Sequence, residues 1–403
     1  MIRVAFTLIG RRSWTGGHNY LVNLLHALSE HGSSRVQPVL FLGEDVEANV
    51  RAPFEAIPGI EVVRRRRFDD VLSASRLRDA ALLGSDRLAL REFRAHHVSA
   101  VFEAAQFYGW RIDLPAIAWV PDFQHRHLRK MFGFKSYWRR EIGLRAQILS
   151  GRHFMLSSED ARRDCERFYP STRGRTHVVR FAIPSPQGIT FADARATADL
   201  YGLPDIFFYL PNQFWSHKNH ECVIEALRLL KAKGSRVVIA ASGLQDDPRN
   251  PRHTLRLKAL IREYGLDQNF LLLGLIPHQH VLALMRASSA LINPSEFEGW
   301  STTVEEAKAA GTPMILSSLR VHREQAQTNA LYFDASSPEQ LASILETFVP
   351  LAAPERHLLA EKARRVAADA VRRYADEFCA LIELVAHPEK PSEKKGLLRR
   401  ISS

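Results

Sequence analysis

Short apolar runs alternate with amphipathic helical patterns along most of this chain, and this alternation constrains the fold more than any other feature. In the first half, the patterns predict strands over residues 2–9, 36–42, 100–103, 116–120, 153–157 and 177–181, and helices over 18–31 and 137–149. In the second half, they predict strands over 206–210, 236–241, 270–273, 290–293 and 313–316, and helices over 220–233, 253–264, 279–287, 303–310, 338–349 and 354–386. Such alternation is typical of a mostly parallel sheet covered by helices, so we expect an α/β fold.

Three prolines and two glycines between residues 184 and 204 interrupt this rhythm. We interpret the stretch as the connection between two similar α/β domains, 1–188 and 189–353, because 403 residues favour more than one domain. A helical segment over 354–387 should pack back across both domains, and the basic tail over 388–403 should be flexible. In sheets of this kind a ligand binds in the crevice outside the C-terminal ends of the strands.

The chain carries a formal net charge of +11. Such an excess indicates an anionic partner, which could be nucleic acid, anionic lipid or a phosphorylated small molecule. The three cysteines, Cys165, Cys222 and Cys379, form no CxxC pair and no zinc-ligand spacing, which indicates a reducing compartment. No apolar stretch approaches the roughly 18 residues that span a bilayer. We expect a cytoplasmic protein, or one held peripherally at the inner face of the cytoplasmic membrane.

A lysine follows the strand predicted at 206–210. Lys218 lies where a polar loop meets a helix that should begin at about Asn219, and a cation there opposes the helix dipole. A bound phosphate would reverse that sign, because helix N-termini bind anions. Two interpretations therefore stay open, a phosphate-binding lysine and an exposed lysine in a solvated first turn.

Two glutamates, Glu298 and Glu306, stand with seven residues between them after the strand at 290–293. The first lies in a loop and the second in the first turn of a predicted helix, so both can face one crevice. Carboxylates at such a place suit sugar hydroxyls, for which they act as hydrogen-bond acceptors. Glu306 has a second interpretation, because Thr303 and Glu306 fit a capping box.

The segment from 123 to 145 mixes basic and aromatic residues and holds one acidic residue, Glu141. Its basic residues are Arg126, Arg129, Lys130, Lys135, Arg139, Arg140 and Arg145, and its aromatic residues are Phe123, Phe132, Phe134, Tyr137 and Trp138. This mixture suits an anionic membrane surface or a lipid-linked acceptor. It equally suits a solvated face whose aromatic rings belong to the core. No nucleic-acid recognition module is present, so we expect no nucleic-acid partner.

With these segments the chain resembles the retaining glycosyltransferases of family 4, also known as glycosyl transferases group 1. The most specific match is the Glu-x7-Glu element from Glu298 to Glu306 within EFEGWSTTVEEAKAAGTP. WSHKNHECVIEALRLL resembles the family's phosphate-binding lysine segment, and the N-terminal element of strand, Gly16-Gly17 and helix resembles its first glycine loop. The resemblance is strong over 205–345 and weaker over 1–30 and 115–184. It implies the GT-B fold, two facing Rossmann-like domains with the active site in the cleft between them.

The resemblance also implies roles for individual residues. Lys218 would neutralise the donor diphosphate, Glu306 would bind the ribose hydroxyls, and Glu298 would contact the transferred sugar. The other implied site residues are Gly299, Trp300, Ser301 and Thr302 toward the donor, and Gly16, Gly17, Asp122 and His125 toward a phosphate or the acceptor.

Three departures from the family pattern concern this site. The family usually has an arginine five residues before the lysine, where this chain has Gln213. Many members have His-Asp after the strand at 116–120, where this chain has Pro121-Asp122. His125 or His127 would then supply the imidazole, unless each is an ordinary surface histidine. The usual Gly-Phe-Gly is here Gly299-Trp300-Ser301.

The expected function is transfer of a hexose from a nucleotide diphosphate sugar to a saccharide or lipid-linked acceptor, in the synthesis of cell-surface polysaccharide or lipopolysaccharide. The sequence contains no aspartate-rich metal site, so we expect no metal and no other cofactor, and the leaving diphosphate would be stabilised by Lys218 and helix dipoles. Two alternatives stay open: a nucleotide-sugar epimerase of the same fold, and a non-catalytic protein that binds sugars or polyanions.

Overall fold

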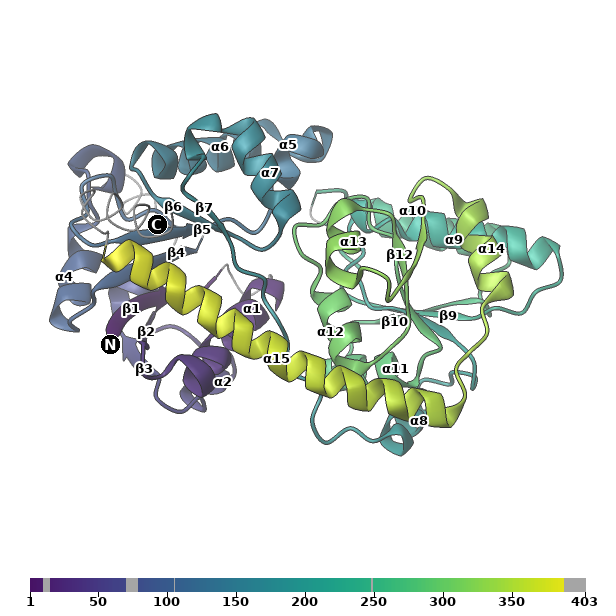
Figure 1. The fold of residues 1–403 in the computed structure, drawn as a ribbon. Helices are drawn as coiled ribbons and strands as arrows, with labels where there is room; N and C mark the ends of the chain where they lie inside the picture. The colour runs from purple at the N-terminus through teal and green to yellow at the C-terminus, as the bar shows by residue number, and fades with distance from the viewer. Residues whose placement is uncertain (10–14, 70–78, 105, 248, 388–403) are drawn as a thin grey trace, which may run out of the picture.

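The computed structural model describes residues 1–9, 15–69, 79–104, 106–247 and 249–387, and shows two α/β domains side by side (Figure 1). Within these ranges, each domain is built on one parallel sheet, with seven described strands in the N-terminal domain and six in the C-terminal domain. The α/β fold expected from the alternation and the two Rossmann-like domains implied by the resemblance are confirmed. The tail over 388–403 lies outside the described residues.

The N-terminal sheet has the strand order β3-β2-β1-β4-β5-β6-β7. Its strands are β1 (Ile2–Thr7), β2 (Val36–Leu42), β3 (Glu61–Arg64), β4 (Ala100–Ala104), β5 (Ala116–Trp119), β6 (His153–Leu156) and β7 (Thr176–Val178). Its α-helices are α1 (Thr15–Ala27), α2 (Ala48–Glu55), α4 (Arg87–Ala95), α5 (Gln124–His127), α6 (Phe134–Leu149) and α7 (Glu159–Phe168), and a π-helical turn over Leu28–Gly32 extends α1.

The C-terminal sheet has the order β10-β9-β8-β11-β12-β13. Its strands are β8 (Phe208–Leu210), β9 (Ile239–Ser242), β10 (Phe270–Gly274), β11 (Ala290–Asn293), β12 (Met314–Ser317) and β13 (Leu331–Phe333). Its helices are α8 (Phe191–Leu200), α9 (His220–Ala232), α10 (His253–Glu263), α11 (His278–Ala287), α12 (Thr302–Ala310), α13 (Arg320–Ala326) and α14 (Pro338–Thr347).

The central strands are apolar runs because both of their faces are covered. Every residue of β4, β5, β9, β11 and β12 is buried. A parallel sheet with helices on both faces requires this pattern, and it explains why these strands could be predicted. The edge strands β3 and β13 are short and partly exposed, so they lack the signal, and we did not predict them.

A single long helix, α15 (Ala353–Ala386), runs across both domains (Figure 1). It packs against α12 in the C-terminal domain and against α1, β1, β4 and β5 in the N-terminal domain. Near its end, the ring of Phe378 lies 5.8 Å from that of Phe6, and Arg35 donates to Glu383 at 2.7 and 2.8 Å. The helix therefore ties the two sheets into one molecule.

Candidate functional site

Polar residues stand at the C-terminal ends of neighbouring strands in the C-terminal domain. Asn212 follows β8, Asn293 ends β11 and Ser317 ends β12, and all three are buried. The amide of Asn212 donates to Asn293 Oδ1 at 3.3 Å, and Ser317 Oγ donates to the carbonyl of Ser295 at 2.6 Å. Buried polar groups require such partners. Asn212, Asn293 and Ser317 thus form a polar base for the loop that carries Glu298.

Lys218 and Glu298 form an ion pair on this base. Lys218 Nζ lies 2.6 Å from Glu298 Oε1, and the two side chains are only 13% and 10% exposed. Ser295 Oγ lies 2.7 Å from the same carboxylate oxygen. Burial by itself would raise the pKa of Glu298, but Lys218, through its charge and its hydrogen bond, acts together with His322 and His217 and lowers that pKa to about 2. The interpretation of Lys218 as an exposed lysine is therefore wrong.

The backbone just after Lys218 explains why this lysine points inward. Asn219 adopts the left-handed conformation with φ of +55°, which Asn tolerates better than most residues. Its side-chain amide donates to the carbonyls of Pro294 (3.2 Å) and Ala335 (2.8 Å). The backbone N–H of Glu296 also donates to the carbonyl of His217 at 2.9 Å. These bonds hold the lysine turn against the glutamate loop.

Glu306 is buried on α12 and pairs with a histidine from the start of α11. His278 Nε2 lies 2.9 Å from Glu306 Oε1, and the carboxylate raises the pKa of His278 against the effect of partial burial. The helix begins after Ser301, and no side chain caps it. The capping box of Thr303 with Glu306 is therefore not formed, and that interpretation is wrong.

The loop between the two glutamates contacts the N-terminal domain. A Cβ atom at Gly299 would lie 2.0 Å from the carbonyl oxygen of Pro121, so only glycine fits there. Trp300 Nε1 donates to the carbonyl of Phe181 at 3.2 Å, and Ser301 is buried beneath. Thr302 opens α12. The Pro121-Asp122 break and this loop thus meet across the interface of the two domains.

Gln213 does not replace a cation. Its Oε1 accepts from the backbone N–H of Leu244 at 2.9 Å, so it anchors the loop between β9 and α10. Arg249 on that loop was missed by sequence reasoning. Its guanidinium lies 3.5 Å from His217 Nδ1 and donates to Gln124 of the N-terminal domain at 3.0 Å. No local sequence pattern indicated Arg249, because only tertiary contacts bring it beside the turn that carries Lys218.

The remaining predicted residues lie in the N-terminal domain. Gly16 and Gly17 belong to the first turn of α1 rather than to a loop before it. Asp122 accepts from the backbone N–H of Gln124 at 2.9 Å. His125 is buried, with Nε2 3.2 Å from Glu141 Oε1, so the surface interpretation of this histidine is wrong. The half-exposed His127 instead faces Phe297 of the opposite domain, with ring centroids 5.1 Å apart.

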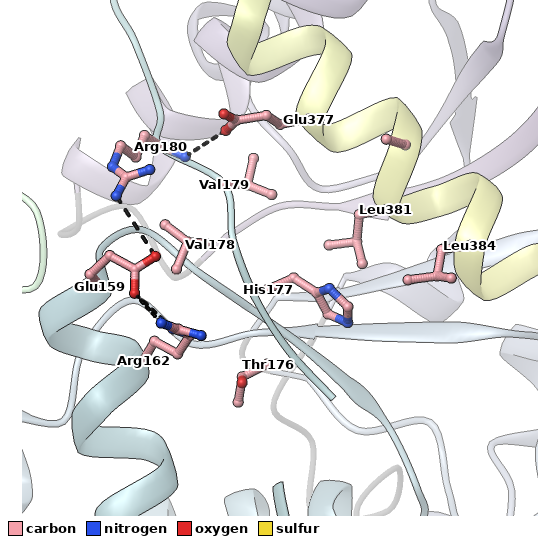
Figure 2. A pocket seen from close by; sticks show the side chains of 11 residues that line it. Glu159, Arg162, Thr176, His177, Val178, Val179, Arg180, Glu377, Leu381 and Leu384 are labelled. Atoms are coloured by element: carbon pink, nitrogen blue, oxygen red, sulfur yellow. Dashed lines mark hydrogen bonds and ion pairs between the residues drawn. The ribbon is translucent and has the colours of Figure 1, made fainter. Parts of the chain in front are cut away.

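Two further features of the described residues concern the wider molecule. A hollow of about 460 Å³ opens between β7, α7 and α15, and its lining includes none of the predicted donor residues (Figure 2). Across the described ranges, His, Cys, Asp and Glu side chains form no group of three or more that could hold a metal ion. In the same ranges no helix is long and apolar enough to cross a membrane.

Comparison with known proteins links the C-terminal part of the chain to a family of glycosyltransferases. Residues 199–366 match the family model described as "Glycosyl transferases group 1". No curated protein sequence matches the chain.

Several solved structures share the fold. A glycosyltransferase from Rickettsia africae ESF-5 has 15% sequence identity and a TM-score of 0.70, over 96% of this chain and 99% of that one. HepE from Anabaena, in complex with UDP and glucose, has 14% identity and a TM-score of 0.69, over 95% and 100%. WaaG, a glycosyltransferase involved in lipopolysaccharide biosynthesis, has 17% identity and a TM-score of 0.58, over 96% and 99%. The fold is GT-B, as expected, and the family match over the C-terminal domain supports a glycosyltransferase.

Proposed function

We propose that this chain is a retaining glycosyltransferase of family 4, which moves a hexose from a nucleotide diphosphate sugar to a saccharide or lipid-linked acceptor. The observation that carries the proposal is the buried pair of Lys218 and Glu298, 2.6 Å apart beyond the strand ends, with Glu306 on the next helix. HepE, which has the same fold, was solved with UDP and with UDP-glucose, which supports a nucleotide sugar as donor.

The proposed donor site works by exchange of charge partners. Without ligand, Lys218 and Glu298 neutralise each other. A donor diphosphate would take over the ammonium of Lys218, and the lone pairs of Glu298 would then accept hydrogen bonds from sugar hydroxyls. Because the pKa of Glu298 is lowered to about 2, its carboxylate acts only as an acceptor at neutral pH. Glu306 would accept from the ribose hydroxyls in the same way.

The transfer step needs the leaving diphosphate to be stabilised. The bond from the anomeric carbon to the diphosphate oxygen breaks, a bond from the acceptor oxygen forms, and the acceptor proton leaves with the diphosphate. Lys218 and the backbone N–H groups at the start of α12, which no side chain of the described residues caps, would stabilise the charge that develops on the leaving oxygen. We propose that no metal takes part, so turnover should persist in EDTA.

Donor binding provides the primary test. A thermal-shift screen against nucleotides and nucleotide sugars should find a ligand that, at 100 times its Kd, adds about 2.7 kcal/mol of stability. Lys218→Ala should abolish that shift. Lys233→Ala, at an exposed lysine after α9, is the matched control and should leave it unchanged. NMR of the product with the identified donor then reports whether the anomeric configuration is retained. Equal shifts for both variants would refute the proposed diphosphate site.

The same preparation separates the two alternatives. Interconversion of free nucleotide sugars without an acceptor would indicate an epimerase of this fold. Binding of a polyanion with no turnover of any donor would indicate a non-catalytic protein.

A second part of the proposal concerns the surface of α6. Four large apolar side chains on this helix are exposed, Phe134 (71%), Trp138 (42%), Ile142 (63%) and Leu149 (88%). Steps of four and seven residues put them on one face of a helix. The acidic member of the segment, Glu141, is buried and faces His125. Apolar residues among exposed basic ones suit an anionic lipid surface, where a lipid-linked acceptor of cell-surface polysaccharide synthesis would lie.

Vesicle binding tests this part. Trp138→Ser with Phe134→Ser should reduce partition into anionic vesicles roughly tenfold or more, because burial of each large apolar side chain contributes about 1.5–3 kcal/mol. Leu255→Ser, at an exposed leucine of α10, is the control. Binding that is unaffected by the double change, or that is equal for neutral vesicles, would show that α6 is a solvated face.

A further inference from the structure

A carboxylate of the C-terminal domain completes the start of a helix in the N-terminal domain. Glu324 on α13 accepts from the backbone N–H of Glu159 at 3.0 Å and from that of Asp160 at 3.3 Å. These are the first two residues of α7, whose cap Ser158 accepts from Ala161 N. Helix starts have unsatisfied N–H groups and favour negative charge. Glu324 therefore satisfies donors that the N-terminal domain does not satisfy by itself.

An arginine strengthens this contact between the domains. Arg180, on the segment that leaves the N-terminal sheet, donates to Glu324 through Nε at 3.0 Å and Nη2 at 2.6 Å. Glu377 of α15 accepts from the backbone N–H of Arg180 at 3.3 Å. Figure 2 shows Arg180 between Glu159 and Glu377 at the edge of the hollow, so solvent reaches the arginine from this side. The start of α7 and Arg180 thus both bond to the Glu324 carboxylate, and α15 bonds to the backbone of Arg180.

The next residue of α13 holds the donor loop. Gln325 accepts from the N–H of Ser301 at 2.9 Å and donates to the carbonyl of Ser301 at 3.0 Å. On the other side of the loop, Ser158 Oγ donates to the carbonyl of Gly299 at 3.1 Å. A single turn of α13 therefore contacts both the start of α7 and the loop between Glu298 and Glu306. Movement of one domain away from the other would pull on both.

We infer that Glu324 is a positioning residue for glycosyl transfer. Its contact with α7 and Arg180 holds the two domains together and, through Gln325, sets the geometry of the Gly299–Ser301 loop. This inference rests on the proposed function. It assigns to Glu324 no contact with either substrate. Lys218, Glu298 and Glu306 all belong to the C-terminal domain, so nucleotide binding should depend little on Glu324, whereas transfer across the interface should depend on it strongly.

The test compares Glu324→Gln with Arg323→Ala in the full-length enzyme. Arg323 is the exposed neighbour on α13, where it lies over the ring of Tyr332, and serves as the matched control. For Glu324→Gln we expect the Kd for UDP or the identified nucleotide to stay within about threefold and kcat to fall about tenfold, since a neutral amide forms weaker hydrogen bonds with these donors than the carboxylate does. Hydrogen exchange at the amides of Glu159 and Asp160 should also accelerate.

The outcomes distinguish the inference from the proposed function. Unchanged kcat and unchanged exchange in Glu324→Gln would overturn the inference. Loss of nucleotide affinity in parallel with kcat would also overturn it, because that result indicates a merely structural role in the C-terminal domain. If the wild-type chain transfers no sugar, the proposed function fails, while faster exchange at Glu159 and Asp160 would still show that Glu324 joins the domains. Glu324→Asp, which keeps the charge, should restore part of kcat.

Discussion

Two segments meet at the domain interface, 290–306 in the C-terminal domain and 116–127 in the N-terminal domain. They differ in how well the sequence predicts where their side chains point. In the first, Glu298 lies in the loop after β11 and Glu306 lies on α12, and their partners Lys218 and His278 belong to the same domain. In the second, His125 follows a strand in the same manner, yet it turns into the interior toward Glu141. The difference teaches that a position after a strand does not by itself decide where a side chain points, because the partner that packing supplies decides it.

Gly299→Ala gives the largest expected effect, because it acts where the two segments touch. The new Cβ would meet the carbonyl oxygen of Pro121 at 2.0 Å, so the loop or the domains must move apart. Displacements of about 1 Å at a reacting centre can reduce rates about a hundredfold, and we expect a loss of that order in kcat/KM. Gly143→Ala is the control, since a Cβ there meets nothing within 4 Å. Gly143→Ala should slightly stabilise α6. Equal kcat/KM for the two variants would contradict the close contact between Gly299 and Pro121.

Glu306→Gln comes second, because it alters one proposed ligand but no contact between the domains. We expect kcat/KM to fall roughly ten- to a hundredfold, since charge-assisted hydrogen bonds contribute about 1.5–3 kcal/mol each. The melting temperature should change little, because Glu306 caps no backbone N–H. Glu305→Gln sharpens the comparison. Glu305 accepts from Gln325 at 3.0 Å and Lys308 at 2.8 Å, so its loss should lower stability and leave donor affinity intact. Wild-type kinetics for Glu306→Gln would remove the ribose assignment.

The smallest expected effect is a pH dependence from His278. Pairing with Glu306 raises its pKa above the ordinary 6.5, so the pair stabilises the fold fully below that pH and loses its contribution as pH rises through the raised pKa. Because His278 is 54% exposed, solvent screening should keep the effect below about 1 kcal/mol. The melting-temperature difference between wild type and His278→Ala should therefore be larger at pH 5.5 than at pH 8. A difference that grows with pH would contradict the pairing.

Much of the fold could be predicted because buried strands and their helices carry strong local patterns. The six described strands that are buried throughout, β4, β5, β8, β9, β11 and β12, appear in the prediction, whereas the short edge strands β3 and β13 do not. Helices α2, α4, α5, α7, α8 and α13 were also missed. Helix α13 has seven residues, and two of its side chains, Glu324 and Gln325, bond to α7 and to the loop at Ser301.

The residues of the candidate site also fall into two groups, those that the sequence predicted and those that only the structure revealed. Lys218, Glu298 and Glu306 could be singled out because each follows a strand within one domain. Arg249 and Glu324 could not, since their partners Gln124, Glu159 and Asp160 lie more than a hundred residues away in sequence. A charged residue with a distant partner looks like any surface charge until the chain is folded.

The amino-acid sequence by itself determined the α/β class, the two domains and the strand-end placement of the lysine and the two glutamates. It did so because periodic burial and the polarity of parallel strands are local properties. Only the tertiary structure decided that Glu306 pairs with His278 instead of capping its helix, that Gln213 anchors a loop, and that Glu324 joins the domains. Those choices depend on which groups the packing brings within hydrogen-bond distance, and local sequence does not encode that distance.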